Sequence, residues 1–378
     1  MDDDLRQTVR RFATRHVATL GEHPTAEAFR EAFARASALG LTGLLIPEEY
    51  GGGGGGHRDN AIAAEELGAA DAGFAAAVNL SATVPGLILA AGTEEQRRAW
   101  LPEIAHGLIL AGAMNEPSVA GSELFHPSPG PESGFATRAN RDADGWRLDG
   151  TKAQWVTNAG VADAYIVFAR TAFDRPGVVS TGAFFVPAGT AGLTIGPRSQ
   201  LLGLRGGWHG EVLLDGVGVP PDALIGPPDG ALPLLAASTA GMAVGLAAVF
   251  VGVARAARDL TLTHVRTRNS WGRPLIEHQA VALPVADMEA EVRQARALVR
   301  EAAAALDDGG DTAVLVPLAK QRAVEAAIAN ASRAVRLHGA TGVTTGAGPE
   351  KLLRDAWTGY ACDFTGDMLR LGVAAALR

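Results

Sequence analysis

Two short stretches decide how this chain is interpreted: AMNEPSVAGS at residues 113–122 and GTKAQWVTNA at residues 150–159. Asn115 carries an amide with one acceptor and two donor hydrogens, and the nearby Pro117 favours an extended or turned backbone there. Trp155 offers a large apolar plane, and Thr157, two residues on, offers a hydroxyl beside it. These groups have the chemistry of a cradle for a flat, redox-active ring. Taken alone, they fit equally well a buried Trp in a strand next to an ordinary turn.

The composition is that of a folded protein with a large core. Of the 378 residues, 47% are hydrophobic and 20% are charged. The net charge of −8 comes without any cluster of basic residues, which argues against nucleic acid as a partner. The single cysteine, Cys362, excludes an internal disulfide and fits a reducing compartment. Because the N-terminus lacks the basic-then-apolar order of a signal peptide, we expect a cytoplasmic location.

One segment raises the question of a membrane. Residues 230–254 contain no charged side chain and are long enough to span a bilayer. The segment is rich in Ala and Gly and is interrupted by Pro233, Ser238 and Thr239. A helix that is apolar all round is also what the centre of a large helical bundle requires. We therefore predict a buried helix and no membrane partner.

Helix signals fill the first hundred residues. Thr25 can cap a helix that ends at Gly40, and Thr93-Glu94-Glu95-Gln96 is a capping box. Six consecutive glycines at residues 51–56 lack the preceding strand and following helix of a dinucleotide fingerprint, so we predict a loop there.

From about residue 109 the pattern changes to short β-type runs separated by Gly, Pro and Asp turns. The clearest runs cover residues 146–150, 164–169, 183–186 and 211–219. No helix of useful length separates them, which favours an antiparallel sheet. The helical period returns after Pro227. The prediction is an α+β, mostly α, protein with a helical domain at 1–108, a β domain at 109–226 and a helical bundle at 227–378.

Several motifs in this order resemble those of the acyl-CoA dehydrogenase family along almost the whole chain. LIPEEYGG at residues 45–52 resembles the family's N-terminal signature. The two stretches quoted above resemble the family's two flavin motifs, but Asn115 and Glu123 stand where threonine and aspartate are usual. Later matches are GLRG at 203–206, Arg268, Trp271, Gly272, Pro274 and Gln279, then Gly339, Gly342 and residues 350–355.

The resemblance implies helices, a β-barrel-like middle domain and a C-terminal four-helix bundle. It also implies bound FAD, a homodimer or homotetramer, an acyl thioester on coenzyme A or a carrier protein, and electron-transfer flavoprotein or oxygen as acceptor. The cofactor residues that it implies are Met114, Asn115, Ser122, Trp155, Thr157, Arg268, Trp271, Gln279, Arg336, Gly339, Gly342 and Thr365. The substrate residues are Ser122, His126 and Phe364, and no metal site is expected.

The catalytic base is the point at which the match is weakest. In the family a glutamate follows the Arg of an Arg-Asp-Ala segment by nine residues; here Asp363 follows Arg354 at that spacing and is one methylene shorter. About 1 Å of misplacement can cost on the order of 10²-fold in rate. A buried carboxylate is a better base than a solvated one because burial raises its pKa. The alternative is that Asp363 caps a helix or faces solvent.

Other departures concern the substrate. Phe364 replaces a family glycine and is expected to narrow or redirect the acyl pocket, Ala243 replaces an arginine, and Arg336 replaces a glutamine. The loop at residues 124–129 is longer than usual and brings His126, while Trp208-His209 replace small polar residues near the flavin edge.

Three functions follow from these features. The leading hypothesis is α,β-dehydrogenation of an acyl thioester with Asp363 as base. The second is a flavin-dependent monooxygenase that uses reduced flavin and oxygen, and the third is a flavin-binding subunit without activity that pairs with an active homologue.

Overall fold

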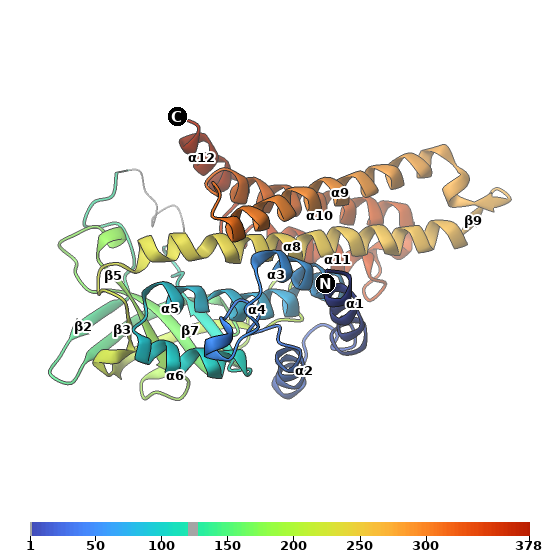
Figure 1. Ribbon diagram of the computed structural model, residues 1–378. Coiled ribbons are helices and arrows are strands. Elements are labelled where there is room, and N and C mark those ends of the chain that lie inside the picture. The colour runs from blue at the N-terminus through green and yellow to red at the C-terminus, as the bar shows by residue number, and fades with distance from the viewer. Residues whose placement is uncertain (1, 120–127) are drawn as a thin grey trace.

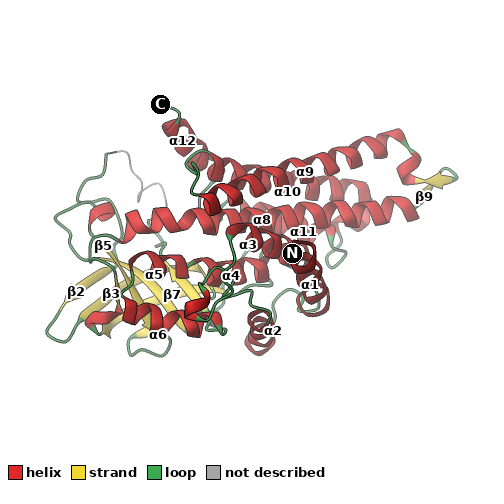
Figure 2. Ribbon diagram, viewed as in Figure 1, coloured by secondary structure: helices red, strands yellow, loops and turns green. Residues whose placement is uncertain are grey.

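The computed structural model describes residues 2–119 and 128–378, which form a helical N-terminal part, a sheet and a long helical bundle (Figures 1 and 2). The N-terminal helices are α1 (Asp2–Phe12), α2 (Ala26–Ala38), α3 (His57–Ala70), α4 (Ala72–Thr83), α5 (Pro85–Ala91) and α6 (Glu94–Ala105). Local capping confirms two predicted starts. Thr25 accepts a hydrogen bond from Ala28 N at 3.2 Å, and Thr93 and Gln96 form the reciprocal capping box.

The sheet contains the strands β1 (Leu110–Ala113), β2 (Arg138–Arg141), β3 (Trp146–Thr157), β4 (Ala164–Arg170), β5 (Thr181–Pro187), β6 (Leu193–Ile195), β7 (His209–Val219) and β8 (Leu224–Ile225). Their order is β6-β7-β3-β2-β4-β5-β8, with β1 paired to β4. No pairing between β6 and β8 closes it within the described residues, so the predicted barrel-like domain is an open sheet.

Most neighbouring strands are antiparallel, as predicted, but β1 runs parallel to β4 and β2 meets β4 in a parallel bridge. A parallel pair needs a crossover, which β1 obtains because the chain forms the β2–β3 hairpin before it returns as β4. Helix α6 covers one face of the sheet, where the rings of Trp100 and Phe185 stack with centroids 4.3 Å apart.

The bundle is built around α8 (Ala231–Thr267), which contacts α3, α4, α9 (Gln279–Asp308), α10 (Leu315–His338) and α11 (Pro349–Gly359). A hairpin of β9 (Asn269–Ser270) and β10 (Arg273–Pro274) joins α8 to α9 at the end of the bundle away from the sheet (Figure 1). The single-turn helix η6 (Gly339–Val343) follows α10, and the chain ends with α12 (Gly366–Ala376).

The charge-free segment predicted as a buried helix lies in α8, where residues 246–254 are buried. Among the described residues, Ala72–Ala91 and Thr239–Thr267 are long and apolar enough to cross a membrane by length and composition. In the second stretch 78% of the most apolar window is buried inside the protein. Its apolar character is therefore accounted for by packing in the core.

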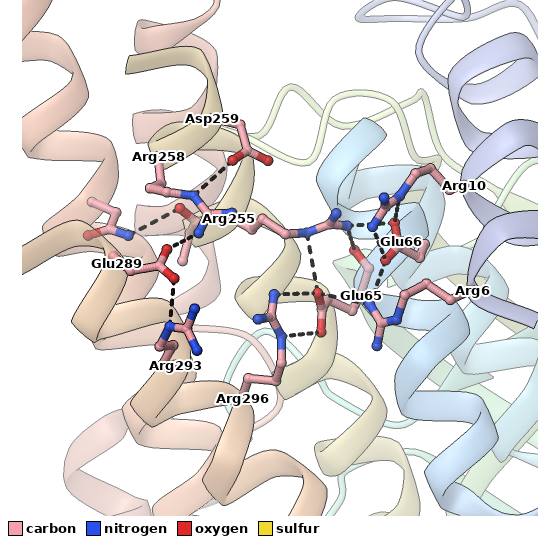
Figure 3. A network of polar contacts seen from close by, with 12 residues as sticks. Arg6, Arg10, Glu65, Glu66, Arg255, Arg258, Asp259, Glu289, Arg293 and Arg296 are labelled. Atoms are coloured by element: carbon pink, nitrogen blue, oxygen red, sulfur yellow. Dashed lines mark hydrogen bonds and ion pairs between the residues drawn. The ribbon is translucent and has the colours of Figure 1, made fainter. Parts of the chain in front are cut away.

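A buried ion-pair network joins the N-terminal helices to the bundle (Figure 3). Glu65 and Glu66 on α3 are 3% and 2% exposed. They bind Arg6 and Arg10 of α1, Arg255 of α8 and Arg296 of α9. Burial alone would raise the pKa of Glu66, but Arg10 and Arg255 hold it below its usual value. Because removing one partner of a buried pair leaves an uncompensated charge, this network fixes α3 against the bundle.

Candidate active site

The two decisive stretches of sequence lie side by side. The chain leaves β1 through Met114 and Asn115, and Ala153 of β3 donates its N–H to the Asn115 carbonyl at 2.8 Å. Lys152, also on β3, donates from Nζ to the Met114 carbonyl at 3.1 Å. These bonds fasten the loop after β1 to the strand that carries Trp155 and Thr157.

A buried ion pair lies under this loop. Lys152 Nζ is 2.8 Å from Glu116 Oε1, and the side chains are 0% and 2% exposed. Glu116 also accepts from the N–H groups of Ala136 and Thr137 at 2.6 and 2.9 Å. Burial, opposed by Glu116, lowers the pKa of Lys152 to about 8, so the pair is ionised at neutral pH. Sequence reasoning missed this pair, although two charges inside otherwise apolar motifs were a signal for it.

A β-bulge turns Trp155 outward. The pairing of β3 with β7 shifts register between Lys152 and Val156, so three residues of β3 oppose one of β7. Bulges re-aim side chains, and here Trp155 stands 43% exposed. A cleft of about 570 Å³ lies beside it, with Pro117, Gln154, Arg198, Ser199 and Glu211 in its lining.

Polar groups at this edge are free to bind a ligand. The Asn115 amide and the Thr157 hydroxyl, both on half-buried residues, make no hydrogen bond to another residue in the described ranges. Together with the exposed Trp155 plane, they fit a flat ring system that offers hydrogen-bond acceptors and donors. The residues present therefore fit the expected flavin.

Asn158 holds this edge in place. It has a left-handed backbone conformation with φ of 68°, and its amide donates to the Leu110 carbonyl at 2.8 Å. Its own N–H donates to the Trp208 carbonyl at 2.7 Å. The next residue, His209, is buried, and burial together with Arg198 lowers its pKa to about 4. His209 is therefore neutral at pH 7 and enclosed by the fold.

Six of the other predicted cofactor residues lie at the end of the bundle away from the sheet. Arg268, Trp271 and Gln279 surround the β9–β10 hairpin, and Arg336 and Gly339 end α10; all five are exposed, Trp271 by 93%. Stacked rings of His264 and His338, 4.2 Å apart, join α8 and α10 at this end. Gly342 is buried, and a Cβ there would lie 2.2 Å from the Val335 carbonyl oxygen.

The structure thus divides the predicted cofactor residues into two groups. Trp155 and Thr157 lie on β3 and Asn115 in the loop after β1, whereas Arg268 and Trp271 follow the last turn of α8, at the end of the bundle away from the sheet (Figure 1). Helix α8 has 37 residues and is about 55 Å long at 1.5 Å per residue.

The segment with Asp363 begins where α11 ends. Asp363 has φ of 58°, and the N–H of Phe364 donates to the Cys362 carbonyl at 2.8 Å, so Asp363 is the central residue of a tight three-residue turn. The residue as a whole is half-buried, but its Oδ2 is closed to solvent and has no hydrogen-bond partner in the described part of the chain. Burial raises the pKa of Asp363, and Lys320 opposes the rise.

Two observations bear on the alternative roles of Asp363. Thr365, not Asp363, caps α12 by accepting from Met368 N at 3.4 Å, and Oδ2 of Asp363 is closed to solvent. The hydroxyl of Thr365, predicted to contact the cofactor, is therefore engaged as a cap. Phe364, the residue after Asp363, is half-buried, whereas Ser122 and His126 lie in residues 120–127, outside the described residues.

Helix α11 is held against both the N-terminal part and the sheet domain through residues 351–355. Arg354 binds Glu22 with two bonds of 2.7 Å, and the buried Asp355 accepts from Leu204 N at 2.6 Å. Lys351 bridges Asp355 at 2.6 Å and Asp71 at 3.0 Å. These contacts set the direction in which the chain leaves α11 toward Asp363.

A sheet edge with open polar groups, beside an exposed indole, and a buried unpaired carboxylate are features of an enzyme site for a flat cofactor. Comparison with known proteins identifies the class. The acyl-CoA dehydrogenase N-terminal, middle and C-terminal domain models match residues 2–108, 111–217 and 235–377, and the chain belongs to the acyl-CoA dehydrogenase family.

Individual relatives agree over nearly the whole chain. The probable acyl-CoA dehydrogenase YngJ of Bacillus subtilis (strain 168) is 34% identical over 380 residues, which is 99% of this chain and 97% of that protein. The mitochondrial short-chain specific acyl-CoA dehydrogenase of Homo sapiens is 32% identical over 99% of this chain and 89% of that protein. The structure of butyryl-CoA dehydrogenase from Megasphaera elsdenii superposes with a TM-score of 0.91 at 27% identity, over 100% of this chain and 97% of that one. The predicted fold class, flavin oxidoreductase class and FAD cofactor are confirmed by this membership.

Proposed function

We propose that this protein oxidises the Cα–Cβ bond of an acyl thioester, with Asp363 as the base that removes the α proton. The observation that carries the proposal is the buried, unpaired Oδ2 of Asp363, at the family spacing from Arg354. A carboxylate without a competing hydrogen bond in a dry site has the raised pKa that proton abstraction requires. Bound FAD supplies the acceptor for the hydride that leaves Cβ.

The residues of the sheet edge hold the ring. The Asn115 amide and the Thr157 hydroxyl bind polar atoms of the flavin, and the exposed face of Trp155 packs against it. The Lys152–Glu116 pair keeps the two stretches together. Phe364 limits the space next to the reacting carbons, which favours a short or compact acyl group.

The second group of cofactor residues supports a subunit interface. Arg268, Trp271 and Gln279 are exposed and lie near the β9–β10 hairpin, at the end of α8 away from the sheet that carries Trp155, so they serve a cofactor bound by another copy of the chain (Figure 1). Arg268 is suited to the phosphates of that cofactor because guanidinium–phosphate hydrogen bonds are charge-assisted. The proposed assembly is a homodimer or homotetramer.

An anaerobic spectral titration of the purified protein tests the reaction. A panel of acyl thioesters on coenzyme A and on carrier protein is added to the FAD-loaded protein, and bleaching of the flavin spectrum is followed. Bleaching of the flavin by one of these thioesters in the absence of oxygen supports the dehydrogenase reaction. Whether the coenzyme A thioesters or the carrier-protein thioesters reduce the flavin faster identifies the carrier. Reoxidation by electron-transfer flavoprotein or by oxygen then distinguishes the acceptors.

Two outcomes contradict the proposal. Protein that binds no FAD yet oxygenates a substrate when a flavin reductase is added is the monooxygenase alternative. FAD-loaded protein that no thioester reduces, alone or mixed with an active homologue, is the inactive subunit.

A further inference from the structure

Lysine is rare in this chain. Of the 33 Lys and Arg residues only three are lysines, Lys152, Lys320 and Lys351. The side chains of Lys152 and Lys351 are 0% and 22% exposed, and Lys320 is 2% exposed. Because a compact ammonium and a planar guanidinium are not interchangeable in the interior, these positions mark places where the smaller cation is required.

Lys320 differs from the other two lysines in its partners. Lys152 and Lys351 form direct ion pairs with carboxylates, at 2.8 Å to Glu116 and 2.6 Å to Asp355. Lys320 Nζ donates to two backbone carbonyls, those of Cys362 at 2.5 Å and Phe364 at 3.2 Å. Among the described residues no carboxylate lies within 4.0 Å of it.

Those two carbonyls flank Asp363. The tight turn at Asp363 has a positive φ, which L-residues other than glycine rarely adopt, so the surrounding structure must maintain it. The Cys362 carbonyl accepts from both Phe364 N and Lys320, and the Phe364 carbonyl is held by Lys320 on the other side. The ammonium group therefore clamps both arms of the turn and leaves the carboxyl oxygen unpaired.

We propose that Lys320 is a positioning residue for proton abstraction, which holds the Asp363 turn in its strained form and sets a positive charge near the carboxyl without pairing to it. This inference rests on the proposed function of Asp363. It explains why the base retains an open oxygen although a lysine is close by. A direct Lys–Asp pair would occupy the oxygen that has to accept the proton.

The charges around the turn are consistent with this role. Burial raises the pKa of Asp363 and Lys320 lowers it, while burial lowers the pKa of Lys320 and Asp363 opposes that change. Cys362, on the same turn, has its pKa raised by burial to about 12 and is neutral at pH 7. Nearby acids of α10 and α12, Glu325 and Asp367, are both paired with Arg370.

The test compares wild type with Lys320→Met and Lys320→Arg. The matched control is Arg322→Met, which removes another positive charge from α10, one that is paired with Glu291 of α9. The first measurement is the rate of flavin reduction by saturating acyl thioester, under anaerobic conditions, as a function of pH. The second is the titration of the Asp363 carboxyl by carbon NMR without substrate, with Asp363→Asn used for assignment.

For Lys320→Met we expect the rise of rate with pH to move to higher pH, because the carboxyl loses a favourable charge. The plateau rate should fall on the order of ten- to a hundred-fold through misplacement, with little change in KM. Lys320→Arg should keep the midpoint near wild type but still lower the plateau, and Arg322→Met should change neither. If Lys320→Met does not fold, an unchanged plateau and KM in Lys320→Arg overturn the proposal.

The two measurements separate the proposals. Wild-type midpoint and plateau in folded, FAD-loaded Lys320→Met overturn the role of Lys320 while the dehydrogenase stands. If no thioester reduces the flavin of the wild type, the proposed dehydrogenase reaction is wrong. The NMR titration then still decides whether Lys320 acts on Asp363. An Asp363 midpoint that is unchanged in Lys320→Met overturns that action, and an upward shift of the midpoint supports it.

Discussion

The Nζ atom of Lys152 lies 2.8 Å from Oε1 of Glu116, and the two side chains are sealed from solvent. Because Lys152 also donates to the Met114 carbonyl, this pair fastens the loop with Asn115 to the strand with Trp155. The geometry of the proposed flavin site therefore depends on a pair of charges that do not themselves form its surface.

Removing one member of this pair should be costly. Lys152→Met leaves Glu116 buried and unpaired, and we expect the free energy of unfolding to fall by about 3–5 kcal/mol. We also expect the variant to retain less FAD. The double variant Glu116→Gln/Lys152→Met should lose less unfolding free energy than the sum of the losses in the two single variants. Chemical denaturation and flavin content measure both effects, and additive losses would contradict the coupling.

Replacement of the base should stop the reaction without removing the cofactor. Asp363→Asn keeps the shape of the side chain but cannot accept the α proton. We expect the anaerobic rate of flavin reduction to fall on the order of 10²–10⁴-fold while FAD stays bound. Stopped-flow absorbance measures the rate, and a value equal to wild type excludes Asp363 as the base.

Phe364→Ala should widen the range of acyl groups. Phe364 is half-buried and directly follows Asp363 in the chain, so truncation should open space near the proposed base. We expect longer or branched thioesters to gain in kcat/KM relative to the best wild-type substrate. An identical ranking of the substrate panel in both proteins would show that Phe364 does not shape the pocket.

Trp271→Ala tests the assembly. A side chain that is 93% exposed in one chain contributes little to the stability of that chain, so Tm of the dissociated subunit should hardly change. We expect a smaller oligomer by light scattering and weaker FAD retention. Val179→Ala, an exposed apolar side chain in the sheet domain, serves as control. Unchanged mass and flavin content in Trp271→Ala would argue against an interface there.

Acid sensitivity should depend on Glu22. The two hydrogen bonds that Glu22 accepts from Arg354 lower its pKa below the usual 4.5. At pH values between the folded pKa and the unfolded pKa, the unfolded chain therefore binds more protons than the folded one. Stability from this pair is present above about pH 4.5 and is lost as pH falls through the folded pKa. Glu22→Gln should therefore lose stability less steeply between about pH 5 and 3 than wild type. Glu31→Gln, from an exposed pair with Arg35, is the control.

Local signals predicted much of the fold. The Thr25 and Thr93 caps depend on residues three apart, and the charge-free stretch in α8 needs only its own composition to be recognised as a core helix. The family motifs supplied the order of domains. In contrast, the parallel pairing of β1 with β4 joins segments more than fifty residues apart, and no local pattern specifies it.

The sequence indicated candidate residues for the site but not their geometry. The outward turn of Trp155 arises from a register shift against β7, which only the paired strand determines. The spacing from Arg354 indicated Asp363, yet the two hydrogen bonds from Lys320 that hold its turn come from α10, some forty residues earlier in the chain.

The scarcity of lysine gives this protein an unusual chemical surface. Apart from its α-amino group, the chain has only the amines of Lys152, Lys320 and Lys351 to offer an acylating reagent, and two of these lie in the interior. Amine-directed dyes and crosslinkers should therefore react poorly with the native fold. Mass-spectrometric labelling at Lys320 would then report directly on how often the turn around the base opens to solvent.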